Sequence, residues 1–144
     1  MNNETVNMVK TIIKAIEAST SLGKNTAAIF DIDGTLMDEK TYVSIQPVVY
    51  LYNYVKSRGI TPFIITARSN DEMNKSITIK QLNNIGVDNY KYLYMRPKQN
   101  FDVLNYKWQC RKNILDNGYN TLFSIGDQYV DIGDYGGLGF IVPK

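Results

Sequence analysis

Apolar positions follow two alternating spacings along the chain. Apolar residues three or four positions apart predict helices, whereas short runs of consecutive apolar residues predict buried strands. The first helix is the clearest case, because Val6, Val9, Ile12, Ile13 and Ile16 fall on one helical face. The spacings predict helices over 4–18, 47–58, 71–84 and 104–116, and strands over 27–32, 61–66, 92–95, 121–125 and 139–142.

This alternation predicts an α/β fold. Strands separated by helices form parallel sheets with helices on both faces, so we expect a Rossmann-like sheet of about five strands. The length of 144 residues suits one domain with its own core. We therefore expect a single domain over 1–144, with an N-terminal helical segment over 1–20 and the core over 27–143.

Composition excludes several classes of chemistry and partner. The chain has no histidine, which rules out histidine nucleophiles, Ser-His-Asp triads and histidine-ligated zinc. Cys110 is its one cysteine, so an internal disulfide is impossible. The net charge of +2 is too small to argue for a nucleic-acid partner. With no signal-like start and no apolar run of about 20 residues, we expect a cytoplasmic protein without membrane contact.

Polar residues follow four of the predicted strands at the ends where ligands bind in parallel sheets. One such residue alone would be read as a loop or cap residue, but four strand ends converging on one edge predict a site. In chain order these residues are Asp31, Asp33, Thr66, Arg68, Arg96, Asp127 and Asp131.

The stretch AIFDIDGT places Asp31 and Asp33 two positions apart after a buried strand. An extended segment would put both side chains on the same side, where like charges need a cation between them. Carboxylates without His or Cys favour a hard cation with oxygen ligands, and Mg²⁺ fits best. An EF-hand calcium loop is the competitor, but it needs glycine at its sixth position, whereas Gly34 stands fourth.

Four motifs in order resemble those of the haloacid dehalogenase (HAD) superfamily of phosphohydrolases. They are Asp31-Ile32-Asp33-Gly34-Thr35, then Ile64-Ile65-Thr66, then Lys107, then Gly126-Asp127-Gln128-Tyr129-Val130-Asp131. The segment around Lys107, together with GDQYVD and FIVPK, is similar to the acid-phosphatase-like branch, subfamily IIIB. Only residues 34–65 separate Asp33 from Thr66, and only residues 67–106 separate Thr66 from Lys107, which leaves no room for a separate cap domain.

The resemblance implies a role for each motif residue. Asp31 would be the nucleophile that forms an aspartyl-phosphate, and Asp33 would protonate the leaving group and then activate water. Asp31, the backbone carbonyl of Asp33 and Asp127 would bind Mg²⁺. Thr66 and Lys107 would hold phosphoryl oxygens, and Asp131 would support the metal or Lys107.

The physical chemistry of these residues agrees with such roles. A carboxylate is a competent covalent nucleophile if positive charge offsets its repulsion of a phosphate. Gly34 permits a sharp turn where the backbone approaches a phosphate. Gly34, Ala67, Arg68 and Arg96 are further candidates for substrate contact, the two arginines being as compatible with simple solvation.

The chain departs from its branch at two places. Ala67 stands where glycine is common in the second motif, and Gly34 where many acid phosphatases have glutamate. We also expect no secretion signal of the kind usual in this branch.

These observations favour a capless Mg²⁺-dependent phosphomonoesterase acting on a small-molecule ester, with nucleotides among the candidates. Three alternatives stay open: a polynucleotide-end phosphatase, for which the charge offers no support, a catalytically silent module that binds a phosphorylated ligand, and phosphoryl transfer to an acceptor other than water. The substrate and the oligomeric state are beyond what the sequence predicts.

Overall fold

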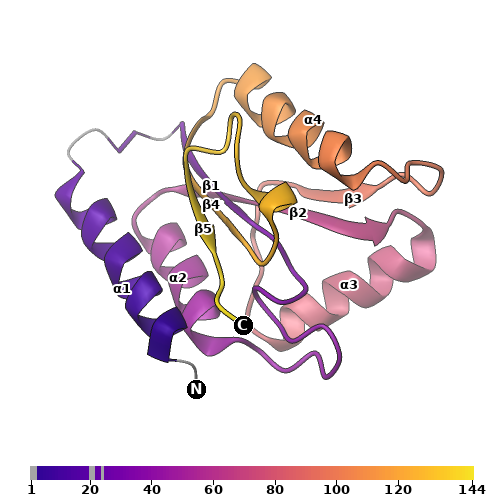
Figure 1. Ribbon diagram of the computed structural model, residues 1–144, viewed down its shortest axis with the longest axis horizontal. Helices are drawn as coiled ribbons and strands as arrows, with labels where there is room; N and C mark the ends of the chain where they lie inside the picture. Colours follow the sequence, from indigo (N-terminus) through magenta and orange to yellow (C-terminus); the bar gives the residue numbers. More distant parts are fainter. Residues whose placement is uncertain (1–2, 20–21, 24) are drawn as a thin grey trace.

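Five parallel strands form one sheet that α-helices cover in the computed structural model, which describes residues 3–19, 22–23 and 25–144 (Figure 1). The sheet order is β3-β2-β1-β4-β5. The strands are β1 (Thr26–Phe30), β2 (Thr61–Ser69), β3 (Leu93–Arg96), β4 (Asn120–Gly126) and β5 (Leu138–Ile141). The helices are α1 (Asn3–Ala18), α2 (Gln46–Ser57), α3 (Glu72–Asn84), α4 (Val103–Asp116) and the short 3₁₀ helix η1 (Tyr129–Asp131). The predicted α/β class, strand number and parallel pairing are confirmed.

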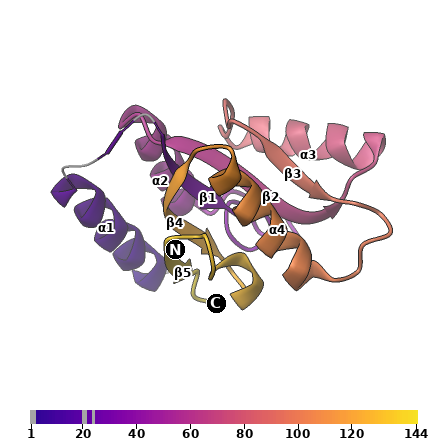
Figure 2. The same cartoon turned by 90° about the horizontal axis from the view of Figure 1, so that it is seen from above.

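The two faces of the sheet carry different helices, and alternation along the strands decides which residues meet them. Ala28 and Phe30 of β1 face the core made with α1, α2 and α3, whereas Ala27 and Ile29 face α4. Figure 2 shows α4 on one side of the sheet and α2 and α3 on the other. Because both faces are buried, β1 consists almost entirely of apolar residues.

Two strand ends differ from the sequence-based boundaries by more than one residue. β1 ends at Phe30 rather than at residue 32, because the carbonyl of Ile32 accepts hydrogen bonds from the amides of Thr35, Leu36 and Met37 and so closes a turn. β2 runs on to Ser69, where it pairs with Arg96 of β3. Both differences lie at the edge where the polar residues gather, which is where periodicity carries the least information.

Among the described residues, no helix is both long and apolar enough to cross a bilayer.

Candidate functional site

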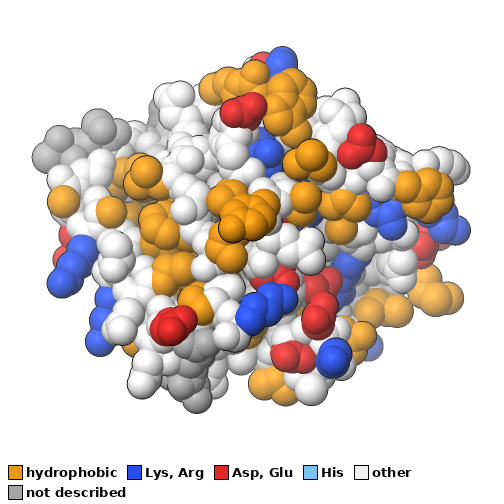
Figure 3. Space-filling model, in the orientation of Figure 1, with side chains coloured by type: hydrophobic (Ala, Val, Ile, Leu, Met, Phe, Trp, Pro, Cys, Tyr) orange, Lys and Arg blue, Asp and Glu red, His pale blue; other side chains and the backbone are white. Residues whose placement is uncertain are grey.

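The predicted polar residues do meet at the carboxyl edge of the sheet. In Figure 3, acidic and basic side chains gather beside one another in the lower central and right part of the face, with hydrophobic side chains around them. The turn after β1 lies between the segments that follow β2 and β4, since β1 pairs with both strands. The sheet order therefore brings Asp31, Thr66 and Asp127 to one place.

Asp31 lies at the centre of a buried polar cluster. Its Oδ1 accepts a hydrogen bond from Lys107 Nζ at 3.1 Å, and its Oδ2 accepts one from Thr35 Oγ1 at 3.2 Å. Lys107 comes from α4, on the face opposite α1–α3, and also pairs closely with Asp131. The side chains of Asp31 and Lys107 are 8% and 5% exposed, so their pairing is shielded from water.

Burial governs the electrostatics of this cluster. It raises the pKa of Asp31 to about 8, with Lys107 opposing the shift and the carboxylates of Asp131 and Asp127 adding to it. Burial alone would lower the pKa of Lys107, but Asp31 and Asp131 outweigh it and the pKa is raised. Lys107 is thus a protonated ammonium between the carboxyl groups of Asp31 and Asp131, and the three carboxyl groups of the cluster outnumber its cations, Lys107 and Lys144.

Asp33 lies outside this buried cluster and has a different partner. Arg68, which follows Thr66 in β2, grips its carboxylate with two hydrogen bonds, Nε to Oδ2 at 2.9 Å and Nη2 to Oδ1 at 2.7 Å. The remaining guanidinium nitrogen donates to Thr78 Oγ1 and Gln81 Oε1 of α3. The hydrogen bonds to Asp33 raise the pKa of Arg68, with burial opposing them. This bidentate pair fixes both the position and the direction of the Asp33 carboxylate.

The expectation that Asp31 and Asp33 point to the same side is not met. It assumed an extended segment through Asp33, whereas the carbonyl of Ile32 accepts hydrogen bonds from the amides of Thr35, Leu36 and Met37 and closes a turn there. Asp31 then faces Lys107, while Asp33 faces Arg68.

A group of three carboxylates has the donor chemistry for a divalent cation. Asp31, Asp127 and Asp131 each offer an oxygen within 4.8 Å of the others. Both oxygens of Asp131 are engaged, one with Lys107 and one with the amides of Asp127 and Gln128. Asp31 and Asp127, whose oxygens contact the side chains of Lys107, Thr35 and Lys144 rather than backbone amides, are the members of this group that could exchange these contacts for a hard cation such as Mg²⁺. A contribution of the Asp33 carbonyl stays a prediction.

Two glycines are required by close approach at this edge. Gly34 has a φ of 76°, and a Cβ there would collide with the carboxylate of Asp127. A Cβ on Gly126 would collide with the side chain of Asp131, which folds back over the start of its own motif. The glycines of the first and fourth motifs thus let the carboxylates reach the site.

Thr66 and Arg96 have structural partners. The buried hydroxyl of Thr66 accepts from the amide of Arg68 at 3.1 Å, which leaves its own hydrogen free to donate. Arg96 Nε donates to the carbonyl of Ala67 at 2.9 Å, and its Nη1 donates to the carbonyl of Asn100 at 2.6 Å. Arg96 therefore ties the segment after β3 to the end of β2, and Ala67 takes part through its backbone.

Three further residues of the site are not among the candidates that the sequence suggests. Thr35 belongs to the first motif, so its contact with Asp31 was open to prediction. Tyr106 donates its hydroxyl to the carbonyl of Thr66 at 2.9 Å, and Lys144 pairs with Asp127 at 3.0 Å. No local pattern signals the last two, because each contact joins segments far apart in the sequence.

The chain is similar to phosphatases and to plant storage proteins. Over 98 residues it is 33% identical to vegetative storage protein 2 of Arabidopsis thaliana and 31% identical to vegetative storage protein 1, covering 67% of this chain and 36% of each relative. The chain therefore spans about a third of the length of these curated relatives.

Solved structures share the fold at lower identity. The class C acid phosphatase from Bacillus anthracis has a TM-score of 0.71 and 15% identity, covering 94% of this chain and 68% of that one. A chain of the Pnkp1/Rnl/Hen1 complex has a TM-score of 0.67 and 22% identity, covering 86% of this chain and 47% of that one.

The family match covers most of the chain. Residues 40–141 match the HAD superfamily, subfamily IIIB (acid phosphatase). That range contains Thr66, Lys107 and Asp127 but begins after Asp33. The match therefore does not include the first motif, whose assignment depends on its residue types and on the geometry of the site. On this match, with the fold and the site in agreement, the chain belongs to the HAD superfamily, subfamily IIIB.

Proposed function

We propose that this protein is a Mg²⁺-dependent phosphomonoesterase that works through an aspartyl-phosphate on Asp31. The observation that carries the proposal is the contrast between two carboxylates at one edge. Asp31 is buried and oriented by Lys107 and Thr35, while Asp33 stands beside it at the surface, held by Arg68.

In the first step an oxygen of Asp31 forms a bond to phosphorus, and the bond from phosphorus to the ester oxygen breaks. Asp33 gives a proton to that oxygen, which leaves as an alcohol. In the second step Asp33 takes a proton from water, whose oxygen forms a bond to phosphorus. The Asp31–phosphorus bond then breaks, which releases inorganic phosphate and restores Asp31.

The other residues of the site stabilise charge. Lys107 can serve a phosphoryl oxygen while still held by Asp131, and the Thr66 hydroxyl can donate to another. Asp31 and Asp127 would hold Mg²⁺, which supplies positive charge against the carboxylates and the phosphoryl group. We place the small-molecule ester, with nucleotides among the candidates, ahead of a polynucleotide end.

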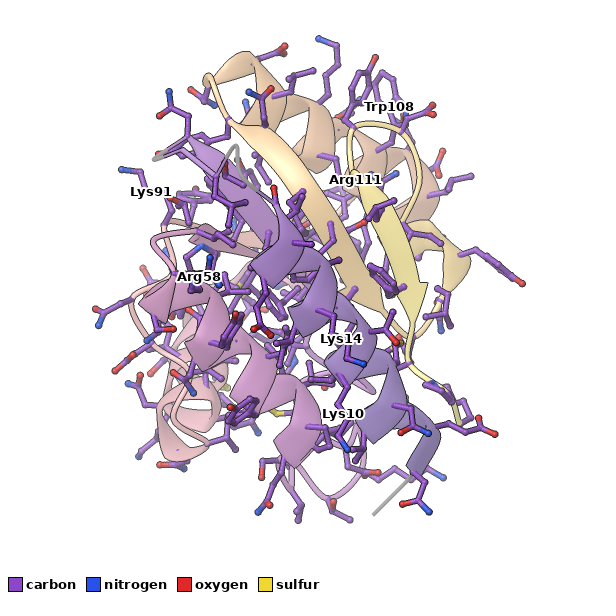
Figure 4. The ribbon with its side chains drawn as sticks, turned by 90° about the vertical axis from the view of Figure 1, so that its left-hand side faces the viewer. Lys10, Lys14, Arg58, Lys91, Trp108 and Arg111 are labelled. Carbon is purple, nitrogen blue, oxygen red and sulfur yellow. The ribbon has the colours of Figure 1, made fainter. Side chains whose placement is uncertain are left out.

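Four of the labelled basic side chains of Figure 4 do not form a path for nucleic acid to the site, and the fifth, Arg111, is buried. Lys10 and Lys14 lie on the outer face of α1. Arg58 follows α2 and Lys91 precedes β3, which places both at the edge of the sheet opposite the site. A polynucleotide-end phosphatase therefore draws no support from these cations.

A non-catalytic binding module is the second candidate, because both Arabidopsis thaliana relatives are named as storage proteins. The intact set of Asp31, Asp33, Lys107 and Asp127 favours catalysis. One experiment separates the two candidates. p-Nitrophenyl phosphate is assayed with Mg²⁺, with Ca²⁺ and with EDTA, and rapidly quenched samples are searched by intact mass and peptide map for phosphate on Asp31.

We expect turnover with Mg²⁺, little with Ca²⁺ because of its larger and looser coordination, and none with EDTA. Asp31→Asn should reduce turnover to background without a phosphate adduct. Full activity in EDTA would contradict the metal-dependent scheme. Binding of phosphate esters without turnover would support the binding module instead.

A further inference from the structure

A second basic residue of α4, one helical turn after Lys107, is buried and has no role in the proposed reaction. This residue is Arg111, which is 2% exposed. A guanidinium keeps its charge inside a protein, and a buried charge is costly unless hydrogen bonds replace its water. Burial lowers the pKa of Arg111, with Asp131 and Asp134 opposing the shift. The hydrogen bonds of Arg111 therefore show what this cation does.

Among the described residues, Arg111 donates to two backbone carbonyls of segment 127–137, which joins β4 to β5. Its Nη1 donates to the carbonyl of Val130 at 2.8 Å, and its Nε donates to the carbonyl of Asp134 at 2.8 Å. Val130 directly precedes Asp131, and Asp134 lies three positions after it. The guanidinium thus holds the backbone on both sides of Asp131.

Segment 127–137 has few side chains of its own that could fix it, because it contains three glycines. A Cβ on Gly136 would lie 3.1 Å from Cδ of Arg111, so the backbone passes close to the arginine. The ring of Tyr135 packs on Trp108 of α4 with centroids 5.4 Å apart, but Tyr135 is 40% exposed. Figure 4 shows Trp108 and Arg111 reaching from α4 toward this segment. Of these two contacts, that of Arg111 is the better shielded from water.

Asp131 connects the backbone that Arg111 holds to both charged parts of the site. One oxygen of its carboxylate pairs with Lys107, and the other accepts from the amides of Asp127 and Gln128 at 3.1 Å each. These amide contacts fix the backbone of Asp127, whose carboxylate belongs to the group suited to a cation. A shift of Asp131 would therefore move the ammonium and a metal ligand together.

We propose that Arg111 is a positioning residue for the site. By holding the carbonyls on both sides of Asp131, it keeps Asp131 on Lys107 and keeps Asp127 beside Asp31. Arg111 touches no reacting group, so it acts on the chemistry through these carboxylates. Its effect on catalysis rests on the proposed function, whereas its effect on segment 127–137 does not.

Hydrogen exchange followed by mass spectrometry tests the hold on the segment without any substrate. Arg111→Met removes every donor and keeps a long side chain. Peptides from segment 127–137 should then exchange at least about 10-fold faster than in the wild type, because two hydrogen bonds to a charged group are lost. Peptides from α1 should keep their rates. Arg111→Lys keeps the charge without the planar fork, so its rates should lie between those of Arg111→Met and the wild type.

A matched control separates positioning from a general loss of stability. Ile114 is fully buried one turn further along α4, where it packs against the sheet. Ile114→Ala should lower the stability of the fold by creating a cavity, but it should not accelerate exchange selectively in segment 127–137.

The same variants test the two consequences for the site. Calorimetric titration with Mg²⁺ should give a Kd about 10-fold higher for Arg111→Met than for the wild type, as is usual when a partner of a metal ligand is lost. At saturating Mg²⁺, kcat for p-nitrophenyl phosphate should fall by about 10- to 100-fold. KM should change little, because the Thr66 hydroxyl does not depend on segment 127–137. Arg111→Lys should recover part of both losses, and folded Ile114→Ala should match the wild type in Kd and kcat.

The outcomes separate this inference from the proposed function. Unchanged exchange of segment 127–137 in Arg111→Met, or an equal change in Ile114→Ala, would overturn the positioning role and leave the phosphatase intact. If the wild type hydrolyses no ester, the proposed function fails, and the exchange rates still decide whether Arg111 holds the segment. If Arg111→Met does not fold, Arg111→Lys decides, since wild-type exchange and Mg²⁺ affinity in that variant would refute the role and intermediate values would support it.

Discussion

Asp31 and Asp33 stand two residues apart, yet they lie in opposite environments. Asp31 is paired with Lys107 in a cluster that water hardly reaches, whereas the side chain of Asp33 is 34% exposed and is paired with Arg68. The difference matches what each step of the proposed reaction needs. A nucleophile benefits from a fixed, dry setting, and a group that exchanges protons with alcohol and water must reach both.

Replacing Asp33 should have the largest effect, and it tests whether Asp31 and Asp33 have different roles. Asp33→Asn should lower turnover of alkyl phosphates by about 10²–10⁴-fold, the usual range for general acid–base help. With p-nitrophenyl phosphate the first step should survive better, since that leaving group departs without a proton. Rapid-mixing kinetics should then show a burst of about one equivalent with phosphate retained on Asp31. Equal losses for both leaving groups would show that Asp33 is not the proton donor.

Removing the cation of the buried cluster should affect both activity and stability. Lys107→Met leaves Asp31 and Asp131 buried without their partner, which typically costs about 3–5 kcal/mol. Urea unfolding should show that loss, and turnover should fall by about 10²–10³-fold. Lys112→Met is the matched control, because its pair with Asp116 is exposed and screened by solvent, so its loss should leave the free energy of unfolding almost unchanged. Similar free energies of unfolding for the two variants would contradict the distinction between a buried and an exposed pair.

Weakening the partly exposed ion pair of Arg68 and Asp33 should have a smaller and more selective effect. Arg68→Gln removes the bidentate grip on Asp33, so we expect kcat for alkyl phosphates to fall by about 10-fold with little change for p-nitrophenyl phosphate. Arg68→Lys should restore only part of the loss, since an ammonium lacks the planar fork. Arg58→Gln, at the opposite edge, serves as the control. A rise in KM with unchanged kcat would indicate substrate contact instead of positioning.

The last prediction concerns the metal-free protein and is the smallest in size. Because the pKa of Asp31 is raised to about 8 in the folded state, its favourable contribution is full below the unfolded value near 4 and declines as pH rises through 8. In EDTA the melting temperature should therefore fall toward pH 8 more steeply for the wild type than for Asp31→Asn. Mg²⁺ at 100 times its Kd at pH 7 should add about 2.7 kcal/mol there, and the same concentration should give a larger melting shift at higher pH, where Asp31 is deprotonated.

The residue types and the order of the motifs make much of the site predictable from the sequence. Lys107 and Asp127 follow from motif order alone, and the structure brings both to the cluster around Asp31. The ion pairs of Arg68 and Lys144 are not predictable in this way. Their partners lie 35 and 17 positions away along the chain, and no repeating pattern connects them. The roles of these residues stay predictions until the variants are measured.

The alternating spacings and the four motifs determined the α/β class, the parallel sheet and the edge where the chemistry gathers, since these follow from local periodicity and strand direction. Tertiary structure decided that the side chain of Asp31 is buried and that of Asp33 is partly exposed to solvent. The carbonyl of Ile32 closes a turn directly after β1, and packing of α4 and α3 on opposite sides then supplies Lys107 to one aspartate and the support for Arg68 to the other. Burial and partner choice depend on chain segments distant in sequence, so only the folded chain specifies them.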